Sequence, residues 1–268
     1  MGLITINEER CIKCEACVQE CPEAVIKMES IGPAEVNAER CIACGHCVAI
    51  CPNEAIDNVK SPLMMQSKMT NTPRLSPEEA KNFIRSRRSI RTYKVKPVER
   101  EKLRQLVEVA NLAPSPGGLS GLSYLIIDDK KTIETLVEEC ITWAENDPNW
   151  SIFLSGVTKR YREHNIDAVL RNAPSIIIAL ADKDFYVGRE SSILALTYLE
   201  LFAPSLELGS CWAGLFELYA RSEASSIYKV LNLPKGKQIT GCVMVGYPKY
   251  SYKRFTGKQP VSVSFYNE

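Results

Sequence analysis

After residue 76 the apolar positions follow two different periods. Four apolar residues within 103–110 recur at three- and four-residue spacing, which predicts one face of a helix. Residues 132–144 read as a second helix, and residues 191–202 as a third that is apolar on nearly all sides and therefore buried, ended or kinked by Pro204. Short continuous apolar runs predict three buried strands, at residues 124–127, 175–180 and 239–246. We therefore expect helices packed around a mixed sheet, in the α+β or α/β class, and we predict α+β.

Residues 1–60 are patterned differently. Short extended stretches stand out at residues 3–6 and 35–37. Residues 61–75 are polar, carry methionines and follow neither period, which is typical of a linker. Ser76, with Glu79 at the capping-box position, then marks the start of a helix. The pattern predicts three parts: a small domain at 1–60, a linker at 61–75 and a larger domain at 76–268.

Composition excludes some classes of protein. The chain has 268 residues, of which 45% are hydrophobic and 24% charged, as in globular proteins with one large or two smaller domains. A formal net charge of +1 gives no reason to expect a nucleic acid or an anionic membrane as partner. The sequence lacks an apolar run of the roughly 20 residues that span a bilayer, and residues 1–10 lack the apolar core of an export signal. We therefore expect a cytoplasmic protein.

Cysteine is concentrated near the start of the chain. Eleven cysteines are present, and eight of them lie between Cys11 and Cys51. They form two runs with the same two-two-three spacing, each closed by a proline: Cys11, Cys14, Cys17 and Cys21, then Cys41, Cys44, Cys47 and Cys51. The second run follows the first at a constant offset, the interval from Cys11 to Cys41, and the flanking residues repeat as well. The two runs therefore indicate an internal duplication.

Three interpretations of these cysteines compete. A disulfide framework suits small secreted domains, and this chain has a long remainder with few cysteines. Structural zinc uses two cysteine pairs separated by a longer loop. The two-two-three spacing closed by proline is instead that of bacterial ferredoxins, which bind 4Fe–4S clusters. The doubled match predicts two such clusters.

The spacing also predicts how the ligands are shared. Three thiolates on a tight loop reach three corners of a cubane, and in ferredoxins with two clusters the fourth cysteine of each run binds the other cluster. Cys11, Cys14, Cys17 and Cys51 would then hold the first cluster, and Cys41, Cys44, Cys47 and Cys21 the second. His46 lies between two ligands of the second run. It faces solvent or tunes that cluster by hydrogen bonding.

Four segments of the larger domain carry a family resemblance. They are residues 87–93 (Arg-Arg-Ser-Ile-Arg-Thr-Tyr), 113–118 (Ala-Pro-Ser-Pro-Gly-Gly), 208–214 (Leu-Gly-Ser-Cys-Trp-Ala-Gly), and 245–248 (Val-Gly-Tyr-Pro) with the basic pair that follows. In this order they resemble the nitroreductase family of FMN-dependent oxidoreductases, in its ferredoxin-fused branch. The resemblance implies FMN as a cofactor beside the two 4Fe–4S clusters.

The basic turn at 87–91 has two interpretations from its residues alone. It is a solvated surface turn, or it binds a phosphate monoester, which arginine forks recognise in paired geometry. The resemblance implies the second, with the FMN phosphate and ribityl chain held by Arg87, Arg88, Ser89, Arg91, Lys253 and Arg254. It also implies that small residues let the main chain approach the flavin ring, with backbone N–H donors at Ala213 and Gly214.

One loop departs from the family. Its members often continue the Pro-Ser segment with an asparagine and a glutamine that bond the flavin, and neither is present at residues 117–121. Ser115 would contribute its hydroxyl, and Gly118 or Ser120 backbone groups. Cys211 lies in another segment and suggests a nucleophile, but neither histidine has a context that implies pairing with it, so we expect a packed small residue.

These features predict an enzyme without catalytic side chains of its own, because the redox chemistry belongs to the cofactor. The expected function is reduction of a small oxidised substrate, nitroaromatic compounds among the candidates. Electrons would enter through the clusters from a donor protein or a reduced ferredoxin. The alternative is an electron carrier or redox sensor with a protein acceptor. The resemblance implies a homodimer, in which the alternating residues 261–265 would add to the partner's sheet or form an edge strand of their own. The aromatic stretch 143–161 would cover the flavin, form a lid or contact the partner subunit.

Overall fold

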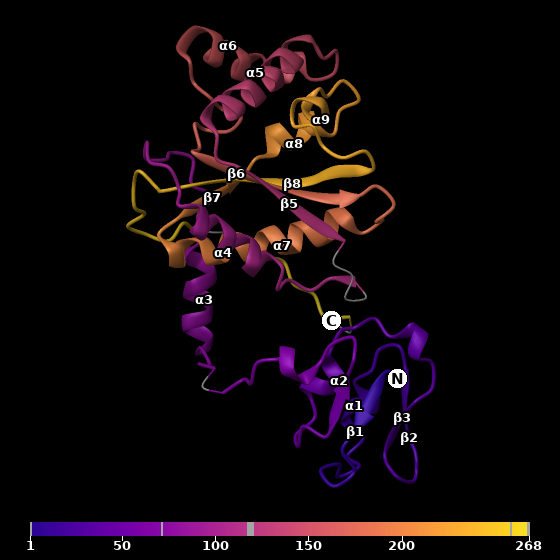
Figure 1. Cartoon of the computed structure of the whole chain (residues 1–268). Helices are drawn as coiled ribbons and strands as arrows, with labels where there is room; N and C mark the ends of the chain where they lie inside the picture. The colour runs from indigo at the N-terminus through magenta and orange to yellow at the C-terminus, as the bar shows by residue number, and fades with distance from the viewer. Residues whose placement is uncertain (1, 71, 117–120, 258, 267–268) are drawn as a thin grey trace. The chain divides into compact units, whose positions relative to one another are not determined.

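The computed structural model describes residues 2–70, 72–116, 121–257 and 259–266. The chain divides into two compact units, residues 1–74 with 115–120, and residues 75–114 with 121–268 (Figure 1). None of the helices in the described ranges is both long and apolar enough to cross a membrane. Each unit is described by itself below.

The first unit repeats one pattern twice. Its strands are β1 (Ile4–Ile6), β2 (Ile26–Met28), β3 (Pro33–Glu35) and β4 (Ile56–Asn58), and its helices are α1 (Ala16–Gln19) and α2 (His46–Ala49), with 3-10 turns η1 (Ala38–Arg40) and η2 (Leu63–Met65). β1 pairs with β4 and β2 with β3, both antiparallel. Helices α1 and α2, like strands β2 and β4, are separated by the same interval as Cys11 and Cys41, as the duplication predicts.

The backbone of the two cysteine loops repeats as well. Lys13 and Ala43 have φ of 53° and 58°, and Glu15 and Gly45 have φ of 62° and 74°. Left-handed conformations of this kind are uncommon for residues other than glycine. Their recurrence at equivalent positions of the two repeats means that both loops curve in the same way, so both present their cysteines in the same arrangement.

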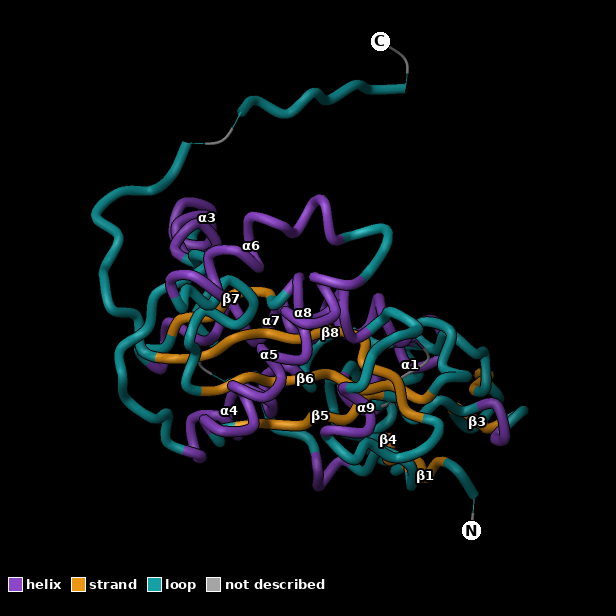
Figure 2. Tube along the Cα trace, turned by 90° about the horizontal axis from the view of Figure 1, so that it is seen from above, coloured by secondary structure: helices purple, strands orange, loops and turns teal. Residues whose placement is uncertain are grey.

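The second unit is built on a four-stranded sheet. Its strands are β5 (Leu122–Ile127), β6 (Ser175–Asp182), β7 (Gly209–Trp212) and β8 (Lys237–Gly246), in the order β5-β6-β8-β7 (Figure 2). All three pairings are antiparallel. In addition, Ser89 forms an isolated parallel bridge with Ser210 of β7. The apolar run of β6 is explained by its central position, because Ile176, Ile177 and Ile178 are fully buried between neighbours on both faces.

Helices cover both faces of this sheet. The helices of the second unit are α3 (Pro77–Ser86), α4 (Arg100–Ala110), α5 (Lys130–Asn146), α6 (Ser151–His164), α7 (Gly188–Phe202), α8 (Gly214–Ala220) and α9 (Ile227–Val230), with a 3-10 turn η4 (Ala203–Leu206). Helices α4 and α7 lie on one face, and α5, α8 and α9 on the other (Figure 1). The predicted α+β class is confirmed, and the predicted capping box is present, since the Glu79 carboxylate accepts from the Ser76 N–H at 2.8 Å.

Two predicted features differ in the structure. Helix α7 ends at Phe202, as Pro204 predicts, but it is buried on one side only: Ile193, Leu194 and Tyr198 on its outer side are about two-fifths exposed. Residues 261–265 form no strand in this chain and are exposed. Both differences leave apolar side chains without cover in the single chain.

Candidate functional site

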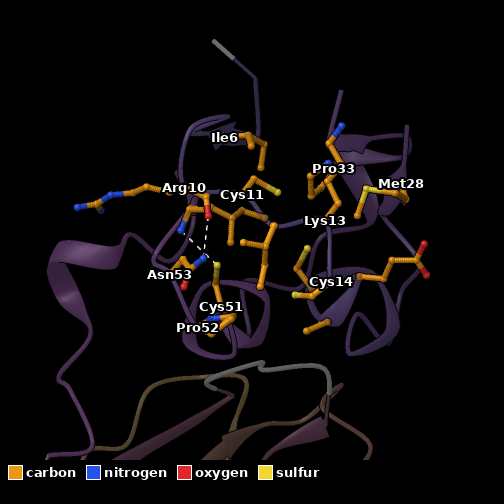
Figure 3. Close-up of a pocket in the computed structure, with 16 residues that line it drawn as sticks. Ile6, Arg10, Cys11, Lys13, Cys14, Met28, Pro33, Cys51, Pro52 and Asn53 are labelled. Atoms are coloured by element: carbon orange, nitrogen blue, oxygen red, sulfur yellow. Dashed lines mark hydrogen bonds between the residues drawn. The ribbon is translucent and has the colours of Figure 1, made fainter. Parts of the chain in front are cut away.

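The first thiol cavity gathers cysteines from both repeats. Cys11, Cys14 and Cys17 come from the first run and Cys51 from the second, and all four line one cavity. Figure 3 shows the labelled sulfurs of Cys11, Cys14 and Cys51 around the same space. The sequence predicts this crossed set for the first cluster.

The second thiol cavity has the complementary set. Cys41, Cys44 and Cys47 line it together with Cys21 of the first run and with Asn58. Within the described ranges, no group of three or more potential ligands converges on the position of a single metal ion. The four thiols of each set line the wall of one cavity, an arrangement that fits a cluster of several atoms.

The chemistry of the thiols follows from their burial. Burial raises the pKa of the Cys17 thiol to about 11, and it also raises the pKa of Cys47. The fourth cysteine of each run accepts a backbone N–H: Ala55 donates to Cys51 Sγ at 3.2 Å and Val25 to Cys21 Sγ at 3.4 Å. Because thiolate is the ligand form, loading iron must release the protons that buried thiols hold.

The basic turn of the second unit lies beside strand β7. Helix α3 ends at Ser86, and the following chain joins β7 through the bridge between Ser89 and Ser210 and through the Ile90 N–H, which donates to the Ser210 carbonyl at 2.9 Å. Arg87 Nη1 lies 3.5 Å from Ser89 Oγ and 3.7 Å from a carboxylate oxygen of Glu200. The predicted residues Arg87 and Ser89 are thus brought together.

Glu200 is a site residue that the sequence does not reveal. Its side chain is 13% exposed, and Ser210 Oγ donates to it at 3.0 Å. Burial raises the pKa of Glu200, while Arg87 and Ser210 act in the opposite direction. The sequence gives one signal for this role, namely a charged residue inside the apolar run of α7, and this signal does not indicate that Glu200 pairs with Arg87 or Ser210. Glu200 holds the Arg87 guanidinium against the turn.

The segment with the basic pair Lys253 and Arg254 is attached to the chain at and after the basic turn 87–91. The chain after β8 runs beside residues 92–94, because Tyr93 forms a bridge with Pro248 and the Lys249 N–H donates to the Thr92 carbonyl at 3.0 Å. Further on, Arg88 donates to Thr256 Oγ1. Lys253 and Arg254, both exposed, lie on the segment between these two attachments.

Arg91 and Ser115, two further predicted site residues, are both exposed. Arg91 is exposed, with Nη1 3.5 Å from the Ser89 carbonyl. Ser115 is exposed, and in the division of the chain into two units it is assigned to the first. Gly118 and Ser120 lie outside the described residues.

The segment after β7 carries Ala213 and Gly214, the two predicted backbone donors to the flavin. The Ala213 N–H donates to the Cys242 carbonyl at 2.9 Å, and the residue is fully buried. In the single chain this N–H is therefore used within the sheet, and the flavin contact at Ala213 stays a prediction. Gly214 is exposed, and a Cβ there would meet only Trp212 Cδ1, at 3.9 Å. The main chain at Gly214 is open to a planar ring.

Cys211 does not have the environment of a nucleophile. It is buried, and burial raises its pKa, against a smaller lowering by Arg91 and Ser89. Activated cysteines have a lowered pKa and an accessible thiolate. The prediction of a packed small residue agrees with this geometry.

A second polar network borders a separate cleft. Glu217, nearly buried, accepts from Trp212 Nε1 at 2.6 Å and pairs with Arg189 at 2.6 Å. Arg189 also lines an open cleft of about 520 Å³ with Lys183, Phe185, Tyr186, Arg221 and Tyr228. The sequence analysis did not predict this network, because Arg189 lies on α7, Trp212 on β7 and Glu217 on α8.

These features define a two-part redox protein with paired thiol cavities on one unit and a basic turn beside an antiparallel sheet on the other. Comparison with known proteins identifies both parts. The nitroreductase family model matches residues 84–247, and a 4Fe–4S dicluster domain model matches residues 3–52. The chain belongs to the nitroreductase family, and a 4Fe–4S dicluster domain precedes the family domain.

Individual relatives are distant. A protein of Archaeoglobus fulgidus named "Putative NADH dehydrogenase/NAD(P)H nitroreductase" is 25% identical over 179 residues, 64% of this chain and 87% of the relative. The iodotyrosine deiodinase of Thermotoga neapolitana is 25% identical over 174 residues, 62% of this chain and 87% of the relative. A nitroreductase of Bacteroides fragilis, solved with bound FMN, has a TM-score of 0.59 and 19% identity, covering 70% of this chain and 98% of its own. Because the identity is only 19%, the similarity to the Bacteroides fragilis structure shows the fold alone.

Proposed function

We propose that the two clusters deliver electrons to a flavin on the second unit, and that the flavin reduces a small oxidised substrate. Family membership makes the chain an FMN-dependent oxidoreductase that also carries 4Fe–4S clusters. The observation that carries the electron route is the presence of two complete four-thiol cavities on the same chain as the family domain. The proposal places the protein in the cytoplasm, where thiols stay reduced and free to bind iron.

The residues of the second unit support an FMN site. Arg87, Arg88 and Ser89 lie together, and the segment with Lys253 and Arg254 is attached beside them. We propose that these five and Arg91 hold the phosphate, whose double negative charge suits arginine forks. The open main chain at Gly214 would face the ring, while Ala213, Ser115 and Gly118 stay proposed contacts. Bound FMN would supply exchange between one-electron and two-electron steps.

The relatives suggest which substrates to try. Their names include a nitroreductase and an iodotyrosine deiodinase. One name refers to a nitroreductase and the other to the deiodination of iodotyrosine, so we propose a nitroaromatic compound and a halogenated phenol as the first probes. A protein that passes electrons only to another protein, and reduces neither probe, is the alternative outcome.

An anaerobic single-turnover measurement tests the electron route. Holoenzyme is mixed with a reduced low-potential ferredoxin, and flavin bleaching is followed before and after each probe is added. We expect bleaching that requires intact clusters, followed by reoxidation by a small compound. The matched preparation retains FMN but lacks clusters. Equally fast flavin reduction by NADH or NADPH in that preparation would show that the clusters are not the entry route.

We also propose a homodimer. The outer face of α7, with Ile193, Leu194 and Tyr198, and the tail residues Val261 and Val263 are exposed in the single chain. Exposed apolar side chains on one helix face and on an extended tail favour association with a second copy. Sedimentation should give a dimer for the natural chain and a monomer for Leu194→Glu, while Lys81→Glu on exposed helix α3 leaves the dimer intact. A natural chain that sediments as a monomer at micromolar concentration contradicts the proposal.

A further inference from the structure

The side chain of Asn58 approaches two sulfurs of the second thiol cavity. Its Nδ2 lies 3.8 Å from Cys41 Sγ and 3.8 Å from Cys47 Sγ, and the residue is only 2% exposed. Buried polar groups are nearly always hydrogen-bonded. Here the amide uses the thiol sulfurs as its acceptors.

The orientation of this amide is fixed from the other end. The side-chain oxygen Oδ1 of Asn58 accepts the backbone N–H of Lys60 at 2.9 Å. The backbone N–H of Asn58 donates to Asp57 Oδ1 at 2.8 Å, which holds the main chain at this residue. A flipped amide would leave the Lys60 N–H facing another donor. The NH₂ group, and not the oxygen, must therefore face Cys41 and Cys47.

The first cavity has a different residue at the equivalent place. The offset between the repeats relates Asn58, the last residue of β4, to Met28, the last residue of β2. Met28 lines the first cavity (Figure 3). A thioether has no N–H to donate. The duplication thus provides two similar sets of thiols that differ in this donor.

Other donors to the described thiols are matched between the cavities. The Ala55 N–H reaches Cys51 in the first cavity, and the Val25 N–H reaches Cys21 in the second, at 3.2 and 3.4 Å. These two bonds are related by the same offset. They affect both clusters alike, so the amide of Asn58 remains as the difference in hydrogen bonding.

We propose that Asn58 raises the reduction potential of the second cluster above that of the first, so that the first electron taken from a donor resides on the second cluster. Reduction adds one negative charge to a cluster, and N–H groups directed at its sulfurs stabilise that charge. The inference rests on the proposed function only in requiring both cavities to hold 4Fe–4S clusters.

An anaerobic redox titration followed by electron paramagnetic resonance tests this order. In Asn58→Met, which copies the first cavity, we expect the reduced-to-oxidised ratio of the second cluster at fixed potential to fall about tenfold, or 59 mV for a one-electron couple. Asn58→Asp keeps an acceptor for the Lys60 N–H and loses the donor, so its potential should fall as well. Met28→Asn should raise the potential of the first cluster.

Gln66→Leu is the matched control. Gln66 Nε2 donates to Ser61 and to the Gly45 carbonyl, next to the second cavity but not to its sulfurs. Its loss should leave both potentials unchanged. Unaltered potentials in Asn58→Met and Asn58→Asp, with both clusters retained, would overturn the inference. Natural protein that shows no 4Fe–4S signal at all would instead contradict the proposed function.

Discussion

Replacing Arg88 by alanine should weaken FMN binding about 10- to 100-fold, because a hydrogen bond to a charged group contributes roughly 1.5–3 kcal/mol. Arg88 is half-buried beside Arg87, and it donates to Thr256 on the segment that carries Lys253 and Arg254. Its removal takes one cation from the proposed phosphate site and releases an attachment of the basic pair. Titration of apoprotein with FMN, followed by flavin fluorescence, measures the change.

Riboflavin distinguishes a phosphate contact from a structural role. It has the same ring and ribityl chain as FMN but no phosphate. If Arg88 binds the phosphate, Arg88→Ala should lower affinity for FMN and hardly change affinity for riboflavin, and Arg88→Lys should lie between because it keeps the charge without the fork. Lys81→Ala removes an exposed cation from helix α3, which precedes the turn, and should change neither. Equal loss for both flavins would mean that Arg88 only supports the fold.

The first unit could be predicted closely because its information is local. Cysteine spacing, the closing prolines and the internal repeat each fix a loop, and the structure gathers Cys51 with the first run and Cys21 with the second. The role of Asn58 could not be read in the same way. An asparagine that follows shortly after the apolar Ile56 has no pattern of its own, and only the fold brings it to Cys41 and Cys47.

In the second unit, the pattern of apolar residues predicts the helices and strands but not which of their faces and N–H groups stay free. Residues 191–202 are apolar on nearly all sides, and their sequence cannot tell a helix buried within one chain from a helix whose outer face is left open. Ala213 is a second example. Its sequence context does not reveal that its N–H donates to the carbonyl of Cys242 on strand β8, because only the fold brings these two residues together.

Replacing Cys51 by alanine should remove or open the first cluster and leave the second. In the crossed arrangement Cys51 completes the cavity of Cys11, Cys14 and Cys17, although it closes the second run in sequence. Loss of one of four thiolate ligands leaves an iron without its protein anchor. Iron content should fall to about half if the first cluster is lost, and to about seven eighths if that cluster loses only the iron that Cys51 would hold. Cys140→Ala, at a buried cysteine of α5, should keep both clusters.

A second substitution identifies which cluster survives. With crossed ligands, the cluster left in Cys51→Ala is the one that Asn58 contacts, so adding Asn58→Met should lower its potential. The cluster left in Cys21→Ala lies in the cavity lined by Met28, so adding Asn58→Met there should change nothing. The reverse result would mean that each run of four cysteines binds its own cluster. It would also place the Asn58 amide beside a cluster completed by Cys51, so ligand sharing and the origin of the potential difference are decided together.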